Sequence, residues 1–295
     1  MAITASQVKE LRQRTGAGMM DCKKALTEKD GDLESAIQWL REKGISRAAK
    51  KAGRTAAEGV VTVRVSEDNK TGVVIELNCE TDFSARNEEF QKFATVTADV
   101  ALANKTNSAE QLLECNHEGK TLQDTLTALI ATVGENMKIR RVHCLEAKDG
   151  VVAGYTHMGG KIGSLVALSG AAPEATANDV AMHIAAAAPR FLQREEVGTV
   201  ELDKEKEVIR KRLQEQGKPE AIIEKALLGQ INSYYGEVCL IDQPFVKEPK
   251  KKVAQYVKES NADSTITGFA RFQLGEGIEV AETNFAEEVA AQIKS

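Results

Sequence analysis

Histidine and cysteine are the residues of this 295-residue chain whose side chains most readily bind metals or act as nucleophiles. They are His117, His143, His157, His183, Cys22, Cys79, Cys115, Cys144 and Cys239. No HExxH or CxxC spacing occurs, and the near neighbours Cys115 and His117 offer too few ligands for a tetrahedral zinc site. His143 and Cys144 are adjacent in an expected strand, so their side chains point to opposite faces. The sequence therefore predicts no metal site, no nucleophile–base pair and five reduced thiols.

Two glycine-containing segments superficially resemble phosphate-binding loops. The segment Gly119-Lys120-Thr121 ends like a P-loop, but position 114, where that motif requires glycine, is Glu114. Residues 159–163, with the sequence GGKIG, lack the glycine order of a dinucleotide loop. The chain also lacks a G-x-S-x-G nucleophile elbow and a clear catalytic carboxylate pair. We therefore expect a protein that is not an enzyme, has no catalytic residues and needs no cofactor.

The amino-acid composition argues against a membrane or a nucleic acid as the partner. A hydrophobic fraction of 42% is that of a globular protein. No apolar run approaches the roughly 18 residues of a membrane span, and the opening segment has no apolar stretch typical of a secretory signal. We therefore expect a cytoplasmic protein with no membrane partner. A net charge of −5 and an aromatic content of 4% argue against direct binding of nucleic acid.

The charge is unevenly distributed along the chain. Residues 1–56 contain 12 basic and 7 acidic side chains, a local charge of +5, which leaves −10 for the remainder. This basic segment either meets an acidic partner or is the solvated face of a small helical domain.

The elements of the basic segment predict a three-helix bundle. Thr4 and Gln7 form a capping box that starts the first helix, and the two glycines after Thr15 end it. A second short helix is expected from Met19 to about residue 27. Apolar residues at helical spacing over 33–40 predict a third helix, closed by Gly44 and followed by a basic helical linker over 46–58. Such a small bundle usually recognises a partner rather than enclosing a reaction.

The remaining sequence alternates between strand and helix patterns. Strands are expected over 60–65, 73–78, 138–146, 151–156, 162–169, 238–241 and 264–272. Helices are expected over 87–103, 108–115, 121–133, 177–188, 250–259 and 283–294, and residues 201–235 read as an antiparallel helical hairpin. Strand pairs separated by a helical insertion imply an α+β fold with several domains.

Two short strings place apolar side chains where a partner could reach them. In 15–26, TGAGMMDCKKAL, Met19 and Met20 begin a helix, where they either bind a partner or fill the bundle core. In 78–83, NCETDF, an aromatic ring follows an acid between a strand and a helix. Phe83 either packs under the helix or projects as an interface anchor.

These strings belong to a longer series of motifs. The series comprises TGAGMMDCKKAL at 15–26, RAAKKAG at 47–53, TDF at 81–83, VGENMKIRR at 133–141, DQPF at 242–245 and TGFARFQLGEGIE at 267–279. In these motifs and in their order the chain resembles the bacterial elongation factor Ts family over nearly its full length.

The resemblance implies an α+β architecture of several domains. It comprises a ubiquitin-associated-like three-helix domain, two α+β core subdomains with antiparallel sheets, an inserted helical hairpin and a C-terminal helical module. On this chain the parts fall at 1–56 for the bundle and linker, 57–142 for the first subdomain, 143–189 with 236–272 for the second, 190–235 for the hairpin and 273–295 for the module.

The resemblance also implies roles for named residues. The segment Thr81, Asp82, Phe83 and Ser84 matches the one that displaces magnesium in the family's partner, although Ser84 stands where relatives carry a branched apolar residue. Met19, Met20 and His157 match further partner contacts.

The function implied is guanine nucleotide exchange on the translational GTPase elongation factor Tu. An alternative is a non-catalytic protein-binding module acting through the N-terminal bundle. The hairpin could join two copies in a homodimer or a two-to-two complex, contact the partner, or do neither.

Overall fold

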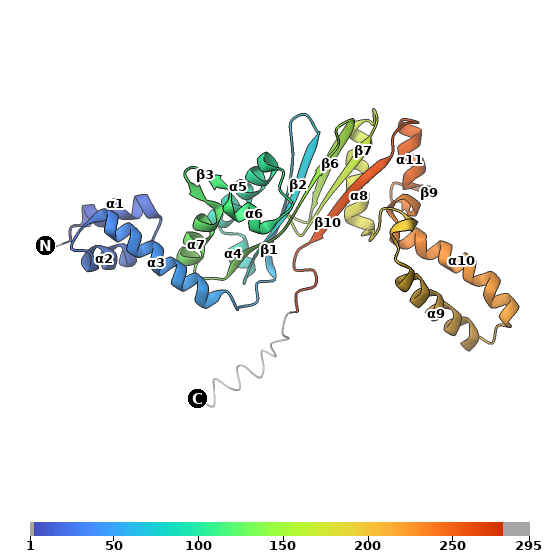
Figure 1. Cartoon of the computed structure of the whole chain (residues 1–295), viewed down its shortest axis with the longest axis horizontal. Helices are drawn as coiled ribbons and strands as arrows, with labels where there is room; N and C mark the ends of the chain where they lie inside the picture. The colour runs from blue at the N-terminus through green and yellow to red at the C-terminus, as the bar shows by residue number, and fades with distance from the viewer. Residues whose placement is uncertain (1–2, 280–295) are drawn as a thin grey trace.

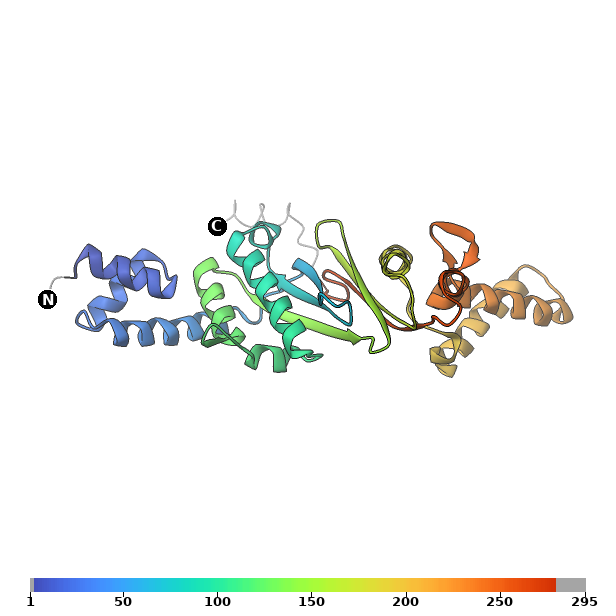
Figure 2. The ribbon, with the colours of Figure 1, turned by 90° about the horizontal axis from the view of Figure 1, so that it is seen from above.

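The protein is elongated, with the N-terminal helices at one end, two sheets in the middle and a helical hairpin at the other end (Figures 1 and 2). The computed structural model describes residues 3–279. The α+β fold expected from the sequence is confirmed. The helix expected over 283–294 and most of the C-terminal module lie outside the described residues.

The N-terminal bundle consists of three helices around a small core. They are α1 (Ala5–Thr15), α2 (Met19–Glu28) and α3 (Leu33–Lys51). The predicted capping box is present, since the Thr4 hydroxyl accepts from the Gln7 amide and the Gln7 side chain accepts from the Thr4 amide. The buried core is Val8, Leu11, Cys22, Ala25, Leu26 and Ala36.

The prediction that the third helix closes at Gly44 is wrong. Helix α3 continues through Gly44 to Lys51. A Cβ added at Gly44 would lie 3.7 Å from the Cβ of Ala131, an ordinary contact distance, so this face of α3 packs against helix α7 (Leu122–Val133). Tertiary packing outweighs the helix-breaking tendency of a single glycine. Helix α3 also contacts the first half of the sheet region directly, since Arg41 binds Asp124 at 2.9 Å. The helical linker expected over 46–58 is helical only to Lys51, and residues 52–57 reach the first strand without helical structure.

The first half of the sheet region is a three-stranded antiparallel sheet in the order β1-β2-β5, with helices on its outer face. Its elements are β1 (Glu58–Val65), β2 (Thr71–Cys79), α4 (Asp82–Ala85), α5 (Glu88–Asn104), α6 (Ala109–Glu114), β3 (Asn116–His117), β4 (Lys120–Thr121), α7 (Leu122–Val133) and β5 (Met137–Glu146). Strands β3 and β4 form a small separate ladder. A large apolar cluster between sheet and helices includes Ile75, Leu77, Phe90 and Leu126.

The second half repeats this plan with the order β10-β7-β6, also antiparallel. Its elements are β6 (Gly150–His157), β7 (Ile162–Ser169), α8 (Glu174–Ala187), η1 (Arg194–Glu196), α9 (Thr199–Glu215), α10 (Glu220–Val238), η2 (Leu240–Asp242), β8 (Pro244–Phe245), β9 (Glu248–Lys252), α11 (Val253–Ser260) and β10 (Ile266–Gln273). Its core lies between the sheet and helices α8 and α11.

The two-helix insertion is α9 and α10, which pack through Ile209, Leu213, Ile223 and Leu227. The strand predicted over 238–241 is wrong. Helix α10 extends to Val238, and Leu240–Asp242 form a 3₁₀ turn. A four-residue apolar run is compatible with either a short strand or a buried helix end, and periodicity cannot distinguish them.

The two sheets pack face to face through apolar side chains and glycines. Between them lie Val61, Val74, Val152, Leu165, Ala167 and Ala270. A Cβ at Gly154 would lie 2.4 Å from Val63 Cγ1, and one at Gly163 would lie 2.5 Å from Val61 Cγ1. The absence of a side chain at these glycines therefore sets the close spacing of the sheets.

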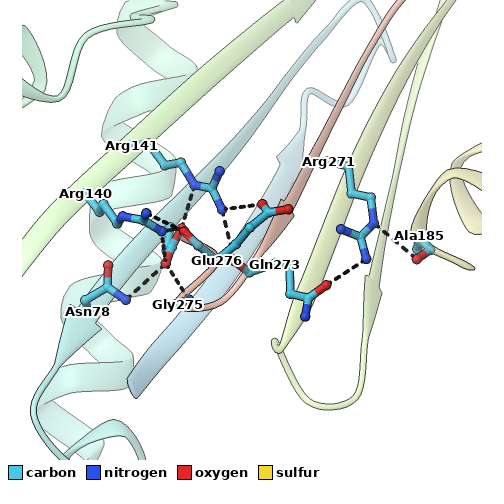
Figure 3. A network of polar contacts seen from close by, with 9 residues as sticks. Asn78, Arg140, Arg141, Ala185, Arg271, Gln273, Gly275 and Glu276 are labelled. Atoms are coloured by element: carbon cyan, nitrogen blue, oxygen red, sulfur yellow. Dashed lines mark hydrogen bonds and ion pairs between the residues drawn. The ribbon is translucent and has the colours of Figure 1, made fainter. Parts of the chain in front are cut away.

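The buried carboxylate of Glu76 ties the halves together, and Figure 3 labels the residues that bind it, Asn78, Arg140, Arg141 and Gly275. Glu76 on β2 is fully buried and accepts from Arg140 and Arg141 on β5 and from the amide of Gly275, which follows β10. Arg140 and Arg141 also donate to the backbone carbonyls of Glu276 and Gln273, respectively. The segment after β10 is thereby fixed against the first sheet.

Candidate functional site

The site is built at the junction between strand β2 and helix α5, where the short helix α4 intervenes. Thr81 is the N-cap of α4, and its Oγ1 accepts from the Ser84 amide at 3.2 Å. This satisfies an amide that a helix start otherwise leaves unpaired. Arg86 closes the turn with backbone bonds to Asp82 and Phe83, and its side chain pairs with Asp82 at 2.8 Å.

Helix α4 turns Phe83 outward. The Phe83 residue is 81% exposed, whereas Ser84 is 7% exposed and Ala85 is also buried. The alternative in which the ring packs under the helix is therefore wrong. A ring this exposed on a capped turn has the geometry of an interface anchor.

Two carboxylates cross to hold the turn. Glu135 Oε2 accepts from the amides of Glu80 at 3.2 Å and Thr81 at 3.1 Å, and its Oε1 accepts from Thr81 Oγ1 at 2.7 Å. In the other direction, Glu80 Oε1 accepts from the Asn136 amide at 2.5 Å. We call these reciprocal bonds between residues 80–81 and 135–136 the carboxylate clasp.

The hydrogen bonds of the clasp shift the pKa of Glu135, and the charge of Glu135 in turn affects the pKa of Cys79. Burial raises the pKa of Glu135, but hydrogen bonds from Thr81, Ser84 and the two amides outweigh it and hold the pKa below its ordinary value. The ionised form is therefore the one the turn stabilises. Burial, together with the charge of Glu135, raises the pKa of the Cys79 thiol to about 12, so this cysteine stays protonated and unreactive at neutral pH.

The methionine pair lies on the N-terminal bundle. Met19 is 60% exposed and Met20 is 75% exposed at the start of α2, while Cys22 on the same helix is buried. The alternative in which both methionines fill the bundle core is therefore wrong. Asp21, beside them, is held by Arg47 of α3 through two bonds of 2.8 and 2.9 Å, which fixes the start of α2 against α3.

His157 lies at the end of β6, where its ring stacks on Tyr155 and Nδ1 lies 3.1 Å from the Tyr155 hydroxyl. The next residue, Met158, is exposed in the turn to β7. Lys161 of this turn binds Glu58 at 2.7 Å.

The His157 turn and the Phe83 turn lie at the same end of the sheets. Glu58, which binds Lys161, is the partner of Cys79 in the β1–β2 register. Cys79 directly precedes the clasp. The structure thus brings residues 81–84 and 155–158 to a common edge, while the methionine pair lies on the bundle joined to that region by α3.

Two other residues that could do chemistry, Cys144 and His183, are buried in the packed halves. His143 and Cys144 are adjacent in β5, as predicted. His183 is buried on α8 and bonds to Gln243 at 2.9 Å. Within residues 3–279, no three His, Cys, Asp or Glu side chains gather as metal ligands, and all five cysteines are free thiols. Over the same residues, no helix combines the length and apolar character needed to cross a membrane.

Sequence reasoning missed Glu80 and Glu135. Glu135 is a single acid 54 residues from Thr81, and no periodicity or local motif links the two. Its position inside VGENMKIRR at 133–141 was the one signal available.

Comparisons with known proteins give a consistent picture. A family model described as elongation factor TS matches residues 80–276. A protein of Clostridium perfringens (strain ATCC 13124), named elongation factor Ts, is 51% identical over 297 residues, covering 98% of each chain. Proteins with the same name from Clostridium botulinum (strain Alaska E43) and Clostridium novyi (strain NT) are 49% and 50% identical, and each alignment covers 99% of both chains.

Proposed function

The chain belongs to the elongation factor Ts family, and from this premise we propose that it is the guanine nucleotide exchange factor of the translational GTPase elongation factor Tu. It acts in the cytoplasm and makes or breaks no covalent bond. The observation that carries the proposal is the outward Phe83 on a turn fixed by the carboxylate clasp.

The proposed mechanism disturbs the partner's nucleotide site. A GTPase holds GDP through phosphate-loop amides and a magnesium ion that bridges phosphate and protein oxygens. Phe83 inserts between helices of the partner near its switch region, with Thr81 and Asp82 fixing the approach. The shifted helices lose the geometry of the magnesium site, and GDP is released. Met19, Met20 and His157 hold further surfaces of the partner.

Ser84 has a supporting role in this proposal. The residue is buried and its amide bonds to Thr81. A polar residue at this position therefore leaves the anchor intact, because Ser84 lies beneath the turn rather than on its outer face.

Linkage sets a thermodynamic condition on the mechanism. The protein must bind nucleotide-free elongation factor Tu more tightly than the GDP form. Whatever factor weakens GDP binding, GDP weakens the binding of this protein by the same factor.

The proposal is tested by following the release of a fluorescent GDP analogue from elongation factor Tu. Stimulated release at substoichiometric amounts of this protein is the expected result, since an exchange factor turns over. An unchanged release rate with complex formation intact would reject the proposal.

A second candidate is a protein-binding module that uses the N-terminal bundle, and the exposed Met19 and Met20 favour it. This candidate predicts that a Met19→Ala/Met20→Ala variant loses binding while Phe83→Ala changes nothing. The exchange proposal predicts that Phe83→Ala slows GDP release strongly.

A further inference from the structure

We propose that Glu135 is a positioning residue that fixes the direction of Phe83 through the carboxylate clasp. The proposal deepens the exchange function and rests on it. Glu135 does not lie on the outer face of α4. It acts on the partner only through the backbone that carries the aromatic ring.

The first step is the chain of hydrogen bonds that begins at Glu135. The Thr81 hydroxyl donates to Glu135 Oε1 at 2.7 Å and accepts from the Ser84 amide at 3.2 Å. A hydroxyl that donates to a carboxylate becomes a better acceptor, so the ionised acid strengthens the helix cap. The same carboxylate receives two successive amides, those of Glu80 and Thr81. Because three donors on two adjacent residues bind one carboxylate, the backbone that enters α4 has little conformational freedom.

The second step concerns the ring itself. Phe83 is almost uncovered, and α4 has only four residues. Side-chain packing therefore contributes little to the direction of the ring. That direction depends on the backbone of the turn, which Glu135 anchors from the inner side.

The third step connects the anchor to the N-terminal bundle. Glu80 accepts from the Asn136 amide, and Asn136 Nδ2 donates to the carbonyl of Arg54 at 2.7 Å and of Ala52 at 3.4 Å. Ala52 is the C-cap of α3. The clasp therefore joins the Phe83 turn to the end of the helix that carries the bundle. Anchors held on one frame bind a partner without an ordering cost at the moment of binding.

The test compares full-length Glu135→Ala and Glu135→Gln with the wild type in stimulated GDP release. We expect the maximal rate to fall about tenfold for Ala, because charge-assisted bonds are among the stronger ones. Gln keeps one acceptor and should fall less. The half-saturating concentration should change little, because the methionine and histidine contacts are untouched.

The matched control is Asp179→Asn. Asp179 is also a half-buried carboxylate with two hydrogen-bond donors, Lys247 and Tyr256, but it lies on α8 in the other half of the molecule. The Asp179→Asn substitution should leave the rate of stimulated GDP release unchanged. An equal loss of rate in this variant would reduce the effect of Glu135 to general destabilisation and overturn the proposal.

A double-variant cycle separates positioning from other roles. If Glu135 acts through Phe83, then Glu135→Gln should cause no further loss in a Phe83→Ala background. Losses that multiply independently would overturn the proposal.

Hydrogen exchange of the free protein tests the clasp independently of the partner. The amides of Glu80 and Thr81 should exchange faster in Glu135→Gln, and those of α8 should not. Unchanged protection at these amides would overturn the positioning role. If wild-type protein fails to stimulate GDP release, the proposed function fails, whereas the hydrogen-exchange result still reports on the clasp.

Discussion

The two halves of the sheet region share one plan of strands and differ in the connections, most plainly at the junction that leads from the first hairpin into the helix. In each, a hairpin of two strands leads into a helix on the outer face and a third strand returns beside the second: β1, β2, α5 and β5 in the first, and β6, β7, α8 and β10 in the second. In the first half the strand-to-helix junction carries Phe83 and the clasp. In the second half the same junction, residues 170–173, reads GAAP and carries no aromatic ring.

The shared plan does not depend on the residues of the candidate site. Both junctions start a helix on a packed sheet, so the fold requires neither Phe83 nor Glu135. The second half instead receives the α9–α10 hairpin after α8. The exposed ring of Phe83 thus lies in a connection, while the sheets support it.

Substitution of Glu76, the buried carboxylate that ties the two halves together, should change the stability of the protein most. Glu76→Ala leaves Arg140 and Arg141 beside an empty buried site, so the free energy of unfolding should fall by about 3–5 kcal/mol. Urea denaturation measures the change, with the exposed Glu118→Ala as control. A loss below about 1 kcal/mol would contradict the idea that this carboxylate ties the halves together.

The methionine pair tests whether the bundle contributes binding rather than exchange. Met19→Ala/Met20→Ala should raise the concentration for half-maximal GDP release about tenfold, because exposed apolar side chains lose their burial in the complex. The maximal rate should remain near that of the wild type. A fall in maximal rate alone would place the bundle in the exchange step and remove the distinction.

Lowering the pH should decrease the stability that Glu76 contributes to the contact between the halves. Burial raises the pKa of Glu76, but the donors Gly275, Asn78 and Arg141 outweigh it and hold the pKa below the ordinary 4.5. The stability it contributes is therefore present above pH 4.5 and is lost as the pH falls toward the folded pKa. In this interval the wild type should lose up to about 1.4 kcal/mol per pH unit more than Glu76→Gln. Equal slopes in urea denaturation would show that Glu76 does not titrate in this way.

The His157 turn should give the smallest effect. His157→Ala removes a ring stacked on Tyr155 at the edge of the second half. A roughly threefold weakening of binding is expected, since rim contacts typically contribute little. Fluorescence titration of the complex measures this weakening. A loss of affinity as large as that of Phe83→Ala would contradict the expectation that the His157 turn contributes less than the Phe83 turn.

The sequence predicted the α+β fold and most helices and strands, because capping residues and hydrophobic periodicity are local signals. It failed at Gly44 and at 238–241, where packing against distant residues decides the conformation. The exposure of Phe83, Met19 and Met20 stayed undecided, since a single apolar residue beside a turn packs inward or outward with the same local pattern. The carboxylate clasp could not be predicted from the sequence, because only the pairing of β2 with β5 brings Glu135 next to Thr81.

In the proposed mechanism, Phe83 drives GDP release. The most direct measurement is stopped-flow release of a fluorescent GDP analogue from elongation factor Tu at saturating wild-type protein and at saturating Phe83→Ala. Loss of an anchor worth about 1.5–3 kcal/mol should lower the maximal rate by roughly 10- to 100-fold, with the free energy of unfolding unchanged. Equal maximal rates for the two proteins would contradict the mechanism proposed for this family member.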